Sequence, residues 1–97
     1  MIRHIVLLTF GDDATDAQIQ AVEDALSTLP GRLPELRAYV IGRDLGINPG
    51  NATFAVAADF DDVDGYVKYR DDPEHRRIIS ELIAPILAGR TAVQYEI

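Results

Sequence analysis

The sequence predicts an α+β fold in which helices cover one face of a single antiparallel sheet. Three observations support this prediction. Strand-like and amphipathic segments follow one another in the order β-α-β-β-α-α-β. The dense turn signal Asn48-Pro49-Gly50-Asn51 separates the two middle strands and favours a hairpin. Both faces of the first strand are largely apolar, so each of them needs a covering layer.

A single domain over residues 1–97 is expected, because 97 residues suffice for one hydrophobic core and not for two. No apolar run is long enough to cross a bilayer. The net charge of −7 repels phosphate backbones and anionic lipid, which argues against a nucleic-acid or membrane partner. The absence of cysteine excludes disulfides and thiolate chemistry. No secretory signal pattern opens the sequence, and we expect a cytoplasmic protein.

The first strand covers residues 2–10 and stops at the turn cluster Gly11-Asp12-Asp13. Side chains alternate along a strand. One face therefore consists of Ile2, His4, Val6, Leu8 and Phe10, and the other of Arg3, Ile5, Leu7 and Thr9. A domain of this size lacks the residues to cover both faces. We therefore expect a second copy of the protein to cover one of them.

The first helix begins at a capping box, in which Thr15 and Gln18 satisfy each other's backbone amides. Its apolar residues form one stripe, at Ile19, Val22, Leu26 and Leu29. Pro30-Gly31 is expected to end it. Strands at 36–43 and 53–60 follow and are predicted to form the hairpin.

The second half of the chain holds two helices and a last strand. Asp61-Asp62 caps a short helix that carries Val63, Tyr66 and Val67 on one side, and Asp72-Pro73 caps and opens a longer helix. Pro85 should bend or end that helix, Gly89 should close it, and residues 91–97 should form the final strand. The complete order pairs into a ferredoxin-like antiparallel sheet with helices on one face.

Both histidines stand on apolar faces. His4 lies on the first strand, and His75 precedes Ile78, Ile79 and Leu82 by helical spacings, so it extends the apolar stripe of its helix. If helices cover the His4 face, both imidazoles enter one space between sheet and helices. The amino end of the helix should keep His75 neutral, and a neutral imidazole suits proton abstraction near neutral pH. The alternative is a pair of core histidines satisfied by hydrogen bonds.

Tyr66 and Tyr69 are neighbours on the short helix. Tyr66 shares the stripe of Val63 and Val67, which favours a core position. Tyr69 lies at the edge of that stripe, six residues before His75, where its hydroxyl is placed to reach a pocket mouth. Helical spacing leaves open which tyrosine lines a pocket.

The run Asp71-Asp72-Pro73-Glu74-His75 combines carboxylates with an imidazole, a set of ligands also found at metal sites. Asp72 already has a sufficient role as an N-cap, and Glu74 favours the positive end of the helix. We therefore predict neither a metal nor a cofactor, and a metal near Asp72 stays the open alternative. No phosphate-binding glycine loop and no serine nucleophile motif occurs in the chain.

Three features together resemble the stress-responsive dimeric α/β-barrel (Dabb) family: the opening Ile2-Arg3-His4-Ile5-Val6, the hairpin, and the run Tyr69-Arg70-Asp71-Asp72-Pro73-Glu74-His75. The resemblance spans nearly the whole chain. It implies a homodimer in which two ferredoxin-like sheets face each other and close a barrel. The second copy would then cover the face that carries Arg3, Ile5, Leu7 and Thr9.

The resemblance also implies a pocket and a chemistry. The pattern is similar to that of olivetolic acid cyclase, a cofactor-free enzyme that closes a linear polyketide by an intramolecular aldol reaction. By this resemblance His75 is the general base beside a carbonyl, Tyr69 orients it or binds the oxyanion, and His4 holds the substrate. The sequence departs from the cyclase pattern at Ala25 and Leu26, which replace a tyrosine, and at Asp72, which replaces a histidine. A different substrate is therefore expected.

Three functions stay open at this point. The first is a stress-responsive homodimer with a small-molecule pocket and no assigned catalysis. The second is a cofactor-free, cyclase-like enzyme or lyase on a carbonyl substrate, with His75 as base. The third is a monooxygenase-like protein that needs no cofactor, or a haem-handling relative. A cavity lined by His4 and His75 beside Tyr69 favours the enzyme, and rings sealed in hydrophobic packing favour the first function.

Overall fold

The computed structural model describes all residues, 1–97, and contains one four-stranded sheet with the strand order β2-β3-β1-β4. The strands are β1 (Ile2–Phe10), β2 (Ala38–Arg43), β3 (Phe54–Phe60) and β4 (Leu87–Glu96). The helices are α1 (Asp16–Leu26), α2 (Leu29–Arg32), α3 (Val63–Asp71) and α4 (Pro73–Ile78), and a π-helical turn (Ile79–Ile83) and a 3-10 turn (Ala84–Ile86) lead on to β4. All strand pairs are antiparallel, which confirms the predicted ferredoxin-like α+β fold and its hairpin.

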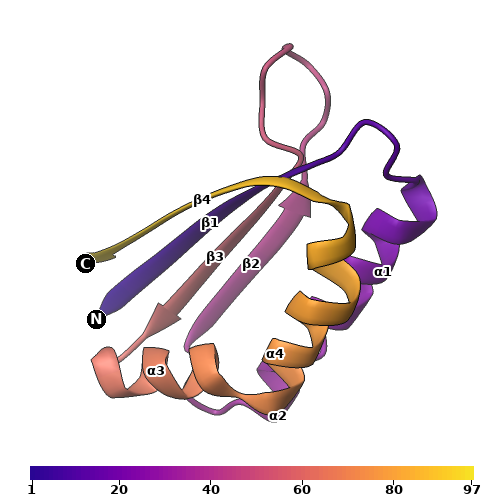
Figure 1. Cartoon of the computed structure of the whole chain (residues 1–97). Helices are drawn as coiled ribbons and strands as arrows, with labels where there is room; N and C mark the ends of the chain where they lie inside the picture. The colour runs from indigo at the N-terminus through magenta and orange to yellow at the C-terminus, as the bar shows by residue number, and fades with distance from the viewer.

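The helices lie together on one side of the sheet (Figure 1), and the hydrophobic core fills the space between them. β1 shows the predicted alternation, since its even-numbered residues from His4 to Phe10 are buried whereas Leu7 and Thr9 are exposed. The helices contribute Ile19, Val22, Leu26, Ile78 and Ile83 to this core. None of the helices has the length and apolar character that crossing a bilayer demands.

Side-chain caps fix where the three main helices begin. The capping box of α1 is complete, because Thr15 and Gln18 exchange hydrogen bonds with each other's backbone amides. Asp62 accepts from the Gly65 amide at the start of α3, and Asp72 accepts from the His75 amide at the start of α4. All three predicted caps are confirmed, and each stabilises its helix by about 1 kcal/mol.

Two predicted boundaries are wrong. α1 ends at Leu26, and Pro30-Gly31 lies inside the short helix α2 instead of ending α1. Proline suits the first turn of a new helix, because the backbone amides of that turn have no hydrogen-bond acceptor within the helix and the amide hydrogen that proline lacks is not needed there. Gly89 does not close a helix but belongs to β4, where it pairs with Thr9 next to an irregularity in the ladder. Pro85 ends the helical run, as predicted, within the 3-10 turn before β4.

No helix covers the opposite face of the sheet, which we call the open face (Figure 1). The strand register places Val93 beside Ile5 on this face and, across β3, Val40 on the same side. Leu7 is 40%, Val93 52% and Val40 69% exposed. Contiguous apolar residues of this kind mark an interaction surface.

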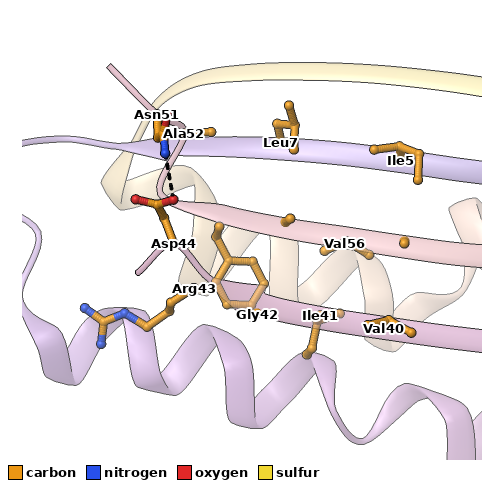
Figure 2. Close-up of a pocket in the computed structure, with 13 residues that line it drawn as sticks. Ile5, Leu7, Val40, Ile41, Gly42, Arg43, Asp44, Asn51, Ala52 and Val56 are labelled. Atoms are coloured by element: carbon orange, nitrogen blue, oxygen red, sulfur yellow. Dashed lines mark hydrogen bonds between the residues drawn. The ribbon is translucent and has the colours of Figure 1, made fainter. Parts of the chain in front are cut away.

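The open face is hollowed over β2 and β3, as Figure 2 shows. Small residues form the floor of this groove, which has a volume of about 670 Å³. They are Gly42, Ala55 and Ala57, and the larger residues Ile5, Leu7 and Val40 line the groove with them. At one end of the groove Asn51 donates a hydrogen bond of 3.1 Å to Asp44. The groove forms because these small residues lie next to larger ones, and a partner surface can fill it.

Candidate functional site

A separate cavity of about 260 Å³ lies between the sheet and the helices. All three predicted site residues, His4, Tyr69 and His75, line it. The remaining polar residues of its wall are Tyr66, Arg70, Arg76 and Arg90, and the apolar ones are Val6, Leu8, Leu26, Val56, Ile79, Ile83 and Leu87. Apolar walls with a few convergent polar groups are typical of small-molecule sites.

The start of α4 positions His75. Asp72 accepts a hydrogen bond of 3.0 Å from the His75 amide, and Arg32 Nε holds the same carboxylate at 3.1 Å. The arginine and the cap together lower the pKa of Asp72, which stays ionised. Beyond α4 the chain widens into the π-helical turn, and Ile79 and Ile83 of that turn line the cavity together with His75. Single π turns occur frequently at functional sites.

The hydrogen bond of the His75 ring determines its tautomer. Its Nδ1 lies 3.3 Å from the backbone carbonyl oxygen of Arg70. A carbonyl oxygen only accepts hydrogen bonds, so Nδ1 carries the proton and Nε2 keeps its lone pair. Burial lowers the pKa of His75, which keeps the ring neutral near pH 7. The neutral state agrees with the sequence analysis, but its main cause is burial rather than the end of the helix.

His4 has the opposite arrangement. Gln94 lies directly across from it on β4, and the Gln94 side-chain amide donates to His4 Nδ1 over 2.8 Å. The neutral ring therefore carries its proton on Nε2. Burial, followed by the positive charge of Arg90, lowers the pKa of His4 to about 4. At neutral pH His4 is thus an uncharged hydrogen-bond donor through Nε2.

The two tyrosines are placed differently from the sequence-based prediction. Tyr69 is only 3% exposed and stacks on the His75 ring, with centroids 4.1 Å apart and planes at 29°. Tyr66, expected in the core, is half-buried and packs 5.0 Å from the His4 ring. Both side chains line the cavity. The stack holds the plane of the His75 ring, which fits an orienting role for Tyr69.

The two neutral histidines make stability depend on pH. The unfolded chain protonates His4 near its ordinary pKa of 6.5, whereas the folded protein does so only near pH 4. The unfolded state binds more protons between these values, so the free energy of unfolding falls as the pH drops through this window, by about 3 kcal/mol for His4. We expect denaturant titrations between about pH 7 and about pH 4 to show this loss, and His4→Gln to reduce it. Equal pH dependence in both proteins would contradict the assignment.

A family model for the stress responsive A/B barrel domain (Dabb) matches residues 2–97. The chain belongs to this family. A dimeric ferredoxin-like protein of unknown function from Thermobifida fusca is similar to this Dabb chain, with 48% identity over 99% of this chain and 90% of that one, at a TM-score of 0.91. A dimeric protein of ferredoxin-like fold from Bacteroides fragilis has 27% identity, covers 99% and 95% of the two chains, and has a TM-score of 0.81.

A more distant solved structure of similar fold is a hydroxynitrile lyase from Passiflora edulis. It has 22% identity to this chain, covers 99% of this chain and 92% of its own, and has a TM-score of 0.84. At this identity the likeness concerns the fold alone. No curated protein matches the chain.

Sequence reasoning missed the arginines of the Dabb cavity. Arg70, Arg76 and Arg90 come from α3, α4 and β4, and only the register of β4 against β1 shows that Arg90 faces the helices. The Asp72 carboxylate, in contrast, already accepts hydrogen bonds from Arg32 Nε and from the His75 amide at the start of α4. No three side chains among histidine, cysteine, aspartate and glutamate converge in the geometry that a metal ion needs.

Proposed function

We propose that this Dabb protein binds a small carbonyl compound in the cavity between sheet and helices and removes a proton from the carbon next to the carbonyl. The proposal rests on two neutral imidazoles in one cavity that carry their protons on different ring nitrogens. His75 offers a lone pair on Nε2, and His4 offers a proton on Nε2. A general base and a hydrogen-bond donor are the two groups that enolate formation requires.

The proposed step needs only these side chains. His75 Nε2 takes the proton, the electrons of the broken C–H bond form the carbon–carbon double bond of an enolate, and the negative charge moves to the carbonyl oxygen. His4 Nε2–H donates a hydrogen bond to that oxygen. Tyr69, stacked on His75, keeps the base in one orientation. A positioned base of this kind accelerates proton transfer by about 10²–10⁴-fold.

Deuterium exchange tests the proposal directly. The probe is 4-oxo-4-phenylbutanoate, whose methylene protons lie next to a ketone and whose size suits a cavity of about 260 Å³. In D₂O near pH 7 we expect the protein to speed the loss of this methylene signal in proton NMR. Binding of the probe without faster exchange would favour a Dabb barrel that binds ligands without catalysis. A probe that leaves the His4 and His75 ring signals unchanged would overturn the binding site itself.

The cyclase-like reaction is an extension of the same step, because an aldol ring closure begins with this proton removal. The hydroxynitrile lyase from Passiflora shows that an enzyme can have this fold. The monooxygenase-like function stays a prediction.

We also propose that the protein is a homodimer joined through the open face. The solved relatives from Thermobifida and Bacteroides are described as dimeric, and the first is 48% identical to this chain. The exposed Val40, Leu7 and Val93 supply an apolar surface on this face. Arg3 and Asp59 also lie there and already satisfy each other through two hydrogen bonds of 2.8 and 2.9 Å. A covering copy therefore meets a neutral ion pair rather than two unpaired charges.

A further inference from the structure

The cavity is positively charged although the protein is acidic, with a net charge of −7. Three arginines line it and no aspartate or glutamate does. Arg70 pairs with the neighbouring Asp71. Of all basic side chains in the protein, every one except Arg76 and Arg90 pairs with a carboxylate. The two unpaired guanidinium groups therefore both lie at this cavity.

Arg76 and Arg90 reach the cavity from different walls. Arg76 follows His75 on α4, and Arg90 lies on β4 directly opposite Leu8, which puts it on the helix-covered face of the sheet. Both arginines are exposed, so they stand at the mouth, whereas His4 and His75 are buried. The charge of Arg90 nevertheless acts inside, because it contributes to the lowered pKa of His4.

Behind this mouth the wall is apolar, and Leu26, Ile79, Ile83 and Leu87 contribute to it. A guanidinium group binds a carboxylate through two parallel hydrogen bonds, a geometry that a neutral ligand group does not match. The volume of about 260 Å³ lies below the range of roughly 300–1,000 Å³ for drug-sized ligands, which indicates a smaller organic body.

We propose that the ligand of this cavity is a small organic acid that also contains a carbonyl group. Its carboxylate pairs with Arg76 and Arg90 at the mouth, its apolar body contacts the leucine and isoleucine side chains, and its carbonyl end reaches His4 and His75. This substrate class rests on the proposed function, because it assumes that the same cavity is the site of proton removal. The acidic remainder of the surface repels anions, so the two arginines also direct the acid to this one opening.

The test compares 4-oxo-4-phenylbutanoate with its neutral amide, 4-oxo-4-phenylbutanamide, by NMR titration of the His4 and His75 ring signals. We expect the acid to bind about tenfold more tightly than the amide. Added salt should weaken the binding of the acid but not that of the amide. Arg90→Gln should remove most of this preference. The matched control is Arg37→Gln, which removes the same charge from an exposed ion pair with Asp61 away from the cavity and should leave the preference intact.

Equal affinity for acid and amide would overturn this inference while leaving the proposed function in place. So would an Arg37→Gln effect as large as that of Arg90→Gln, since the preference would then follow net charge rather than the cavity. Inorganic phosphate binding as tightly as the acid would mean a general anion site and would also overturn it. If neither organic compound shifts the ring signals, the proposed function and the substrate class fail together.

Discussion

Replacing His75 by glutamine is expected to slow protein-catalysed deuterium exchange of 4-oxo-4-phenylbutanoate by about 10²–10⁴-fold. Glutamine has a polar side chain of a reach comparable to that of the imidazole but no basic nitrogen, so only the proton transfer is lost. The rate of methylene exchange in D₂O, followed by proton NMR at saturating probe, measures the effect. Binding of the probe should change much less than the rate, since Arg76 and Arg90 remain.

Arg77→Gln is the matched control for this variant. Arg77 lies two residues further along α4 and points its guanidinium to Glu74 and Glu81 rather than into the cavity. Its exchange rate should stay within about threefold of the natural protein, because a surface ion pair contributes little to stability. An exchange rate in His75→Gln equal to that of Arg77→Gln would remove His75 from the mechanism.

Replacing Val40 by aspartate is expected to convert the proposed homodimer into monomers at micromolar concentration. Val40 is 69% exposed in one chain, so an aspartate there should change the stability of a single chain little. In the dimer, however, it places an unpaired charge in the interface that covers the open face. By two-fold symmetry each interface receives the charge twice. Sedimentation velocity of the natural protein and the variant measures the change in mass.

Val63→Asp is the control for this experiment, because Val63 is 60% exposed but lies at the first position of α3, on the helix side of the sheet. An aspartate there suits the positive end of the helix and should leave the dimer intact. A natural protein that sediments as a single chain at micromolar concentration would contradict the homodimer. A Val40→Asp dimer as stable as the natural one would place the interface elsewhere.

Local signals were sufficient to predict most of the fold. The capping box at Thr15, the aspartate caps and the alternation along β1 are decided by neighbouring residues, and all are confirmed. The boundary near Pro30 was not predictable in the same way, because a proline is compatible both with the end of one helix and with the first turn of the next, and here it lies in the first turn of α2. Gly89 was misplaced since its role depends on pairing with Thr9, eighty residues away in the chain.

The candidate site was predictable only in part for the same reason. His4 and His75 each stood out against an apolar stripe, and the structure brings both to one cavity. Tyr69 is buried more deeply than expected and Tyr66 less deeply, and both line the cavity, because helical spacing gives the order of residues around a helix but not how deeply each one is covered by the sheet. Gln94 and Arg90 gave no local signal. Their positions follow from the register of β4 against β1, which no neighbouring residue encodes.

The protonation states of the two histidine rings test the account most directly. Long-range proton–nitrogen NMR correlation distinguishes the two neutral tautomers of histidine from each other and from the imidazolium ion. At pH 7 we predict two neutral rings, with the proton of His75 on Nδ1 and that of His4 on Nε2. A charged His75, or two rings in the same tautomer, would contradict the division into base and donor on which the proposed chemistry depends.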